Sequence, residues 1–244
     1  MNVASVLATA GRVLAQIKHD PRTVALLLIV PSLLIGLVAW IFTETPVFAT
    51  IGPAIIALFP FIVMFLVASI STLRERRSGT LERLLTMPVG KGSFILGYAL
   101  AFGLLSIVQT AIAVAFSVWV CGLEIAGQIW LLFVVAVVDA LLGTALGLLA
   151  SAFARSEFQV VQFMPALVFP QILLGGLFLP RDQLPDVLQT IGDWLPLSHA
   201  MDALGAVASG DEDSAYVLVR IVFICAWIIG AIALGSVTLR RRTP

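Results

Sequence analysis

The chain has 244 residues, of which 60% are apolar and only 11% are charged. An ordinary soluble domain carries roughly 25% charged residues, so this composition excludes a soluble globular protein. It also excludes a disordered chain, because disordered chains are poor in apolar residues. The 14 basic and 14 acidic residues balance, so net charge indicates no nucleic-acid partner. The composition therefore predicts a protein embedded in a lipid bilayer.

Residues 2–20 open the chain with an amphipathic pattern. Apolar side chains recur at helical spacing, at Val3, Val6, Leu7, Ala10, Leu14 and Ile17. The pattern predicts a helix that lies flat on the cytoplasmic membrane surface, with Arg12 on its polar face. Asp20-Pro21 ends this helix before the first span, although a continuation of that span is the alternative.

Six nearly charge-free stretches follow, and each is long enough to cross about 30 Å of hydrocarbon. We expect membrane helices at 23–43, 51–73, 93–120, 129–154, 158–179 and 215–239. Alternating β-barrel patterning is absent, so the predicted fold is an all-α membrane protein with six transmembrane helices, forming a single transmembrane domain over 1–244. Gly143 and Gly147 predict a close helix–helix approach in the fourth span.

The basic residues are distributed unevenly between the two membrane sides. If the N-terminus is cytoplasmic, 12 of the 14 Lys and Arg residues share the cytoplasmic side, and Arg181 and Arg220 are the exceptions. Most acidic residues fall on the other side. Both termini are therefore predicted to be cytoplasmic. The first apolar run is too long for a signal peptide.

Two polar segments interrupt the spans. Between the second and third spans, Gly79 and Thr80 predict the start of a short amphipathic helix over 78–87, suited to docking a cytoplasmic partner. A solvated loop is the alternative. Residues 180–207 predict two short half-helices at the outer mouth, one along Leu184, Val187, Leu188 and Ile191 and a second from about Ser198 to Val207. Trp194 is the expected interface anchor.

The chain carries no recognisable catalytic or metal-binding set. There is no HExxH or GxSxG motif. The pair Gly90-Lys91 does not form a phosphate-binding loop, because that loop needs a glycine at position 85 and a serine or threonine after the lysine, where this chain has Leu85 and Gly92. Cys121 and Cys225 belong to no Cys/His cluster. We therefore expect no catalytic residue, no metal and no cofactor in this chain. Energy for any transport comes from a partner or from an ion gradient.

Asp139 is the sole charge deep in a span, which makes it a candidate functional residue. Gln109, Thr110 and Gln162 lie in other spans at a depth where they are expected to hydrogen-bond it. These four residues are a candidate substrate path. The alternatives are a structural hydrogen bond between helices and a carboxyl group kept neutral.

Two segments resemble the ABC-2 type transporter permeases, particularly their drug-resistance export branch. Residues 74–100 match the family pattern after the second span, at Arg74, Glu75, Gly79, Thr80, Leu81, Glu82 and Leu84. Residues 175–204 match the family's extracellular stretch, at Gly176, Phe178, Pro180, Leu184, Pro185, Leu195, Pro196 and Leu197.

The resemblance implies an elbow helix over 2–20 and a coupling helix over 78–87. Contact with a separate ATP-binding subunit falls on Arg74, Glu75, Arg76, Gly79, Thr80, Leu81, Glu82 and Arg83. An external cap falls on Gly176, Phe178, Pro180, Pro185, Trp194 and Pro196. The family works as a dimer of permease units in the bacterial plasma membrane, with ATP and Mg bound by the partner subunits. The implied function is export of an amphiphilic, drug-like or lipid or glycolipid substrate.

Three rivals stay open. An ion-coupled secondary transporter would use Asp139 as its proton carrier and would need no ATPase. A membrane enzyme acting on lipids would need convergent polar groups within the spans. A passive assembly subunit would transport nothing.

Overall fold

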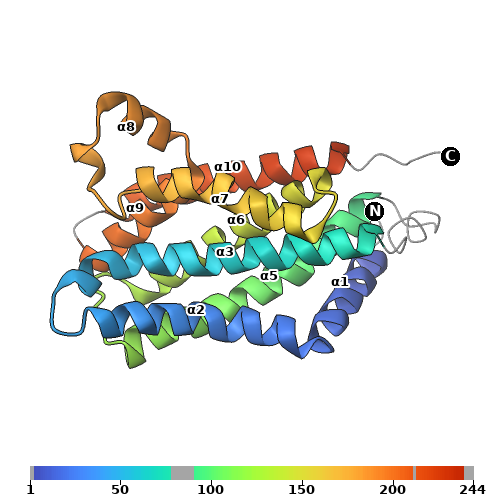
Figure 1. Cartoon of the computed structure of the whole chain (residues 1–244), viewed down its shortest axis with the longest axis horizontal. Coiled ribbons are helices and arrows are strands. Elements are labelled where there is room, and N and C mark those ends of the chain that lie inside the picture. Colours follow the sequence, from blue (N-terminus) through green and yellow to red (C-terminus); the bar gives the residue numbers. More distant parts are fainter. Residues whose placement is uncertain (1–2, 78–90, 211–212, 239–244) are drawn as a thin grey trace.

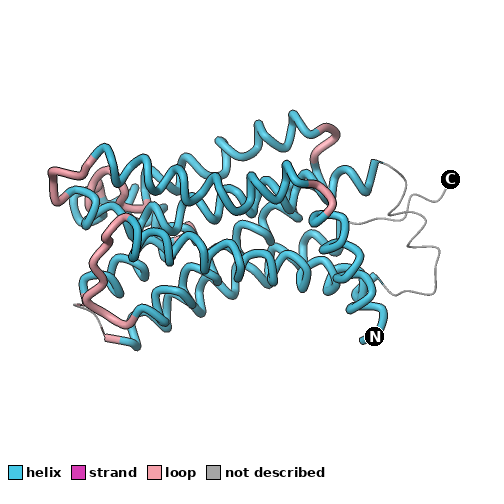
Figure 2. Tube along the Cα trace, turned by 90° about the horizontal axis from the view of Figure 1, so that it is seen from below, coloured by secondary structure: helices cyan, strands magenta, loops and turns pink. Residues whose placement is uncertain are grey.

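The computed structural model describes residues 3–77, 91–210 and 213–238, and all regular elements within them are helices (Figure 1). Six of these helices are long and apolar enough to cross a membrane, by length and composition. They are α2 (Pro21–Ile41), α3 (Val47–Arg77), α5 (Lys91–Ala115) with its π-helical continuation η1 (Phe116–Val120), α6 (Ile129–Phe153), α7 (Glu157–Leu174) and α10 (Ser214–Thr238). The long helices run side by side, with loops at the ends of the bundle (Figure 2). The predicted six-helix, all-α membrane fold is confirmed.

The remaining elements lie at opposite ends of this bundle (Figure 1). Helix α1 (Val3–Lys18) lies where α3 ends and α7 begins, and we refer to this as the α1 end. The other end, called the α8 end, carries η2 (Arg181–Gln183), α8 (Asp186–Asp193) and α9 (Pro196–Ser209). The predicted second half-helix from Ser198 to Val207 falls within α9.

Helices α3 and α6 form the centre of the bundle. In their most apolar stretches 67% and 56% of residues are buried, against 17% in α2 and in α10. A Cβ atom added at Gly143 or Gly147 would collide with the backbone oxygen of Phe61 or Phe65 on α3. Only glycine permits this approach, so the close packing predicted from the glycine spacing is confirmed.

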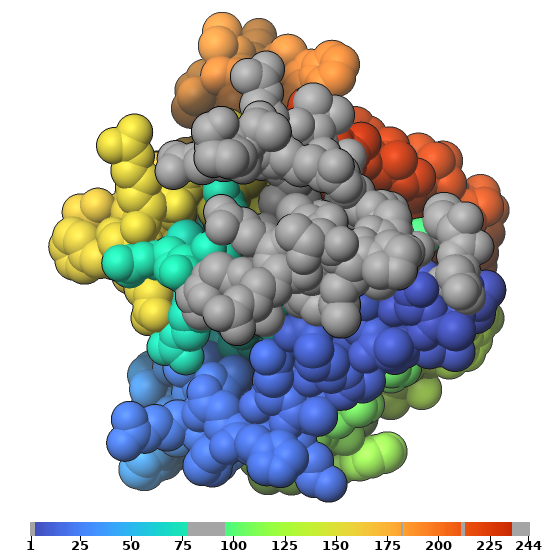
Figure 3. Space-filling model, turned by 90° about the vertical axis from the view of Figure 1, so that its right-hand side faces the viewer, coloured from blue at the N-terminus to red at the C-terminus, as the bar shows by residue number. Residues whose placement is uncertain are grey.

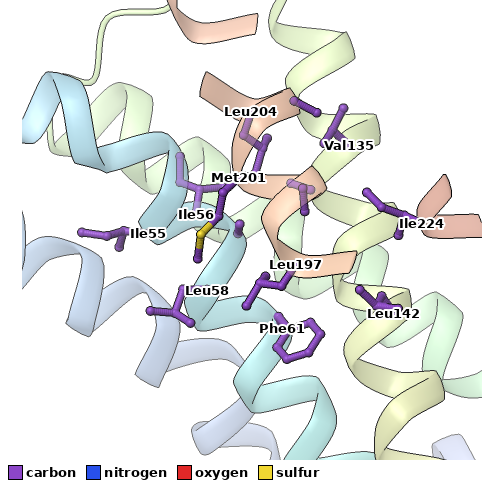
Figure 4. Close-up of a cluster of buried hydrophobic side chains, with 14 of the residues drawn as sticks. Ile55, Ile56, Leu58, Phe61, Val135, Leu142, Leu197, Met201, Leu204 and Ile224 are labelled. Carbon is purple, nitrogen blue, oxygen red and sulfur yellow. The ribbon is translucent and has the colours of Figure 1, made fainter. Parts of the chain in front are cut away.

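The core at the α8 end is shared between four helices (Figure 4). Ile56 and Phe61 of α3 meet Leu142 of α6, and all three side chains are completely buried. Helix α9 contributes Leu197, Met201 and Leu204, and α10 contributes Ile224. Between membrane helices such side chains stabilise the fold through close van der Waals packing, because lipid tails are as apolar as the side chains themselves. Helix α9 is therefore an integral part of the bundle core.

The buried face of α1 differs from the predicted stripe. Ala10, Val13 and Ile17 are buried, whereas Val3 and Leu7 are 72% and 57% exposed. The reason is that α1 packs against α5, where Gly97 meets Thr9 and the Val6 carbonyl oxygen. The helix therefore has a second apolar side, which is exposed in the part of the chain that the structure describes.

Local sequence explains where two of the spans begin and end. The Asp20 carboxylate accepts the backbone N–H groups of Arg22 and Thr23 and so caps α2. Helix α7 ends at Leu174, five residues before the expected boundary at 179. The chain turns there because Gly176 adopts a φ of +87°, a conformation that favours glycine.

Candidate functional site

The predicted coupling helix over 78–87 lies outside the described residues, and with it Gly79, Thr80, Leu81, Glu82 and Arg83. The chain leaves α3 at Arg77 and enters α5 at Lys91, both at the α1 end. Arg74, Glu75 and Arg76, expected to share the coupling role, form the last turn of α3. Figure 3 looks onto this end, where α1 forms much of the visible surface.

Glu75 joins α3 to α1. Its carboxylate accepts two hydrogen bonds from the Arg12 guanidinium, with N–O distances of 2.7 and 3.2 Å. Arg12 also donates to the Tyr98 hydroxyl of α5 at 3.1 Å. Arg12, predicted on the polar face of the helix, therefore lies on a side of α1 that faces α3 and α5.

Arg74 joins α3 to α7. Its guanidinium donates two hydrogen bonds to the Glu157 carboxylate, at 2.8 and 3.2 Å. Asp20, which caps α2, lies 3.9 Å away on another side of Arg74. Hydrogen bonds from the Thr23 hydroxyl and backbone lower the pKa of the Asp20 carboxyl below its usual value. The group is thus ionised beside Arg74 at neutral pH.

Arg76 joins α3 to α6, because it donates to the backbone oxygen of Ser151 in the last turn of α6. Such a bond satisfies one of the carbonyl groups that every helix leaves free at its C-terminus. Three consecutive residues of the predicted coupling set therefore bind three different helices of this chain.

Asp139 is fully buried in α6, and neither carboxylate oxygen has a hydrogen-bond partner in the described part of the chain. It is spaced four residues from Gly143, so both lie on the side of α6 that faces α3. Thr144, which contacts the Ser106 hydroxyl of α5 at 3.4 Å, points about 140° away from Asp139 round α6.

The expected hydrogen bonds to Asp139 are not formed. Gln109 and Thr110 are buried on α5, but their side-chain polar atoms are unpaired within the described residues. Gln162 is exposed on α7. The cause is orientation, since α5 packs on the Thr144 side of α6. Within the described residues these four side chains therefore do not form one hydrogen-bonded group.

The predicted external cap lies at the α8 end. Phe178 and Trp194 are 72% and 69% exposed, whereas Pro196 is buried at the first turn of α9. Pro180 and Pro185 precede η2 and α8, and Gly176 makes the turn after α7. Helix α8 stands away from the bundle (Figure 1), and its apolar side chains are exposed at Val187, Leu188 and Ile191.

Arg181 is the functional-site candidate that sequence reasoning missed at this end. Its guanidinium pairs with Asp193 at the end of α8 and with Asp202 of α9. Burial raises the pKa of the Asp202 carboxyl, although the Arg181 and Arg220 charges oppose this effect. Arg220 stacks over Tyr216 at 3.6 Å. Their signal in the sequence was that these two arginines lay on the acidic side.

Gln171 was also missed, and it fixes the start of α9. Its side-chain oxygen accepts the backbone N–H of Leu197 at 3.0 Å, and its amide nitrogen donates to the Leu167 carbonyl oxygen at 2.8 Å. Both groups of a buried amide are thereby satisfied. A glutamine inside an apolar run gives no sequence signal of this partner.

Comparison with known proteins gives one family. A sequence model of the ABC-2 type transporter matches residues 5–207. The chain is 26% identical over 194 residues to "ABC transporter G family member 20" of Dictyostelium discoideum, covering 79% of this chain and 27% of that protein. It is 30% identical over 151 residues to "Probable multidrug ABC transporter permease YbhR" of Escherichia coli strain K12, covering 62% of this chain and 41% of that protein.

A third relative is "Nodulation protein J" of Rhizobium leguminosarum bv. viciae, 31% identical over 98 residues, which are 40% of this chain and 38% of the relative. In these three comparisons the chain spans between 27% and 41% of the curated relative's length.

Proposed function

Because the chain belongs to the ABC-2 type transporter family, we propose that it is the membrane-spanning permease subunit of an ATP-driven exporter. The family establishes a membrane component of an ABC transporter, whose kind associates with ATP-binding subunits. In the proposal, separate subunits bind ATP and Mg and hydrolyse the nucleotide, and a second permease chain completes the transporter. This chain supplies the path and no catalytic residue.

The observation that carries the proposal is the position of the coupling segment. Residues 78–90 join two spans at the α1 end, directly after a turn of α3 that contacts α1, α6 and α7. The clustering of basic residues supports a cytoplasmic location for this end, with the α8 end outside. Relatives from Escherichia coli support the plasma membrane of a bacterium.

The second permease chain has a candidate contact surface on α7. Only 22% of the most apolar stretch of this helix is buried, and Gln162 lies on its exposed side. A polar amide facing lipid is costly, so a second permease chain placed there, the same or homologous, relieves that cost. We place the substrate path along this surface, between the two permease chains.

The proposed substrate is amphiphilic: a drug-like molecule, a lipid or a glycolipid. One relative is named a probable multidrug permease, which supports the drug-like class. In the proposed cycle, ATP-driven closure of the partner subunits displaces residues 78–90, and the spans rearrange so that the path opens at the α8 end.

Co-purification tests this function. The permease, expressed with the P-loop protein of the neighbouring reading frame, should retain it and show ATP hydrolysis stimulated by transported compounds. A Glu82→Arg change should keep the complex assembled but uncouple hydrolysis from transport. Full transport by an assembled Glu82→Arg complex contradicts the role of Glu82, and transport without any ATPase contradicts the whole proposal.

The fully buried Asp139 favours a second candidate, an ion-coupled transporter. That candidate predicts transport driven by a proton gradient in vesicles that contain this chain alone. Asp139→Asn, with expression checked, should abolish such transport. Undiminished transport by the variant removes Asp139 from the mechanism.

A further inference from the structure

The last turn of α3 binds three helices through three consecutive side chains. Arg74 reaches the first turn of α7, Glu75 reaches α1 and Arg76 reaches the last turn of α6. Successive residues of a helix point about 100° apart, so one turn faces three neighbours at once. Any rotation or shift of this turn therefore acts on all three helices.

The two charged pairs have the geometry that makes ion pairs strong. Glu75 with Arg12 and Glu157 with Arg74 are both bidentate, with N–O distances between 2.7 and 3.2 Å. Bidentate arginine–carboxylate pairs fix direction as well as distance. The Glu75 side chain is only 12% exposed, so water screens its pair weakly. The Arg74 pair is more exposed, and we expect its contribution to be smaller.

Each pair includes a residue, Glu75 or Arg74, that lies just before residues 78–90 in the chain. In the proposed function, residues 78–90 are the segment that contacts the ATP-binding subunit. A displacement of that segment acts directly on the last turn of α3, because Arg77 is the final residue of the helix, just as it acts on α5, which begins at Lys91. The pairs then form a contiguous path from this turn into α1 and α7, and bonded networks of this kind are one way in which two sites are coupled.

We propose that the pairs Arg12–Glu75 and Arg74–Glu157 form a relay that carries the ATP-driven movement of residues 78–90 into α1 and α7. Arg74 and Glu75 are then positioning residues inside the permease, and their partners are Glu157 and Arg12 rather than the ATP-binding subunit. The inference rests on the proposed function.

Charge exchange tests the relay in the complete complex with its ATP-binding subunits. Arg12→Glu and Glu75→Arg each place like charges together, and the double variant restores a pair of reversed polarity. Movement at the α8 end is measured in a background in which the two native cysteines are removed by Cys121→Ser and Cys225→Ser. In this background Phe178→Cys provides a single thiol, and its rate of labelling by maleimide is compared with and without ATP and Mg. Phe178 suits this probe because it is 72% exposed.

Each single variant should keep ATP hydrolysis within about twofold while the ATP-dependent change in labelling falls about tenfold. The double variant should restore at least about half of that change, because the pair is re-formed. Lys18→Glu is the matched control, since it makes the same charge change on an exposed side of the same helix and should respond like the wild type.

A normal response in both single variants overturns the inference, and so does a double variant that hydrolyses ATP without regaining the response. If a single variant fails to assemble, Arg12→Lys serves instead. Lysine keeps the positive charge but cannot form the two parallel hydrogen bonds of the guanidinium, so the response should fall about threefold.

The Arg74→Glu and Glu157→Arg exchange tests the second pair, with Arg155→Glu as its exposed control. A wild-type complex that binds no ATPase, or shows no ATP response, contradicts the proposed function instead.

Discussion

The two ends of the bundle both carry arginine–carboxylate pairs, but the pairs connect different parts of the chain. At the α1 end the bonded residues are 63 and 83 positions apart, and they join separate long helices. At the α8 end Arg181 binds residues only 12 and 21 positions away. The first arrangement links α3 to α1 and α7, whereas the second holds residues 181–202 together as a local unit.

This difference separates two mechanical roles. A perturbation at the α1 end acts on more than one helix, because each pair joins α3 to another helix, α1 or α7. A perturbation at the α8 end stays within η2, α8 and the start of α9, apart from the contacts that α9 makes in the core. The close packing of α3 on α6 in the centre of the bundle connects the two ends, because both helices run between them.

The largest effect is expected from Gly143→Ala, which should weaken both ends together. The added Cβ collides with the Phe61 carbonyl oxygen, and such overpacking costs up to about 3 kcal/mol. We expect a lower thermal unfolding temperature in detergent and less folded protein. Gly230→Ala is the control, because its Cβ meets open space. Equal stability of the two variants would mean that the centre does not depend on the glycine contact.

Gln171→Leu should act at the α8 end alone. It leaves the buried Leu197 N–H without an acceptor, at a cost of about 1–3 kcal/mol. Hydrogen exchange should quicken in the first turn of α9 and stay unchanged in α1. Gln162→Leu, a change of an exposed glutamine on the same helix, should leave exchange in α9 unaffected. Faster exchange in α1 would contradict the separation of the two ends.

Arg181→Ala should sharpen the comparison further, because it removes both bonds of the local unit at once. Asp202 is then left half-buried without its strongest partner, which costs about 1–2 kcal/mol. Limited proteolysis should cut within residues 181–195 faster, while ATP hydrolysis by the complex stays at its basal rate. A fall in basal hydrolysis would show that the unit is connected to the α1 end.

The smallest effect is a pH dependence of opposite sign at the two ends. Burial raises the pKa of Asp202 above 3.8, so its contribution to stability is greatest below that pH and declines as pH rises through the folded pKa. Hydrogen bonds lower the pKa of Asp20 below 3.8, so its contribution is present above 3.8 and is lost as pH falls. Hydrogen exchange from about pH 3 to 7 should therefore change in opposite directions at α9 and at the start of α2. Asp202→Asn should abolish only the α9 slope, and equal slopes at both ends would refute the assignment.

The sequence predicted the spans because their signal is local. Apolar runs, Asp20-Pro21 and the glycine spacing each act through neighbouring residues or through one helix face, and the six helices are confirmed. The early end of α7 was missed because Gly175-Gly176 follows an apolar run that hydropathy alone continues.

Partners across the bundle were not predictable in the same way. Arg12 and Glu75 look like surface charges in the sequence, and nothing near either residue identifies the other. The expected partners of Asp139 failed for a related reason, since the apolar pattern gives no indication of which side of its helix each polar residue faces. Pairing depends on helix rotation, which a single sequence specifies only through the complete packing.

Helix α7 is attached to other helices at two points, and it can bend between them. Glu157 fixes one end to α3 and Gln171, fourteen positions or about 21 Å further along the helix, fixes the other to α9. Pro165 and Pro170 lie between these points, where each removes a backbone N–H from the helix and permits bending. A displacement of Glu157 would therefore move the α8 end of this helix by an amount that depends on how far the helix bends at the two prolines.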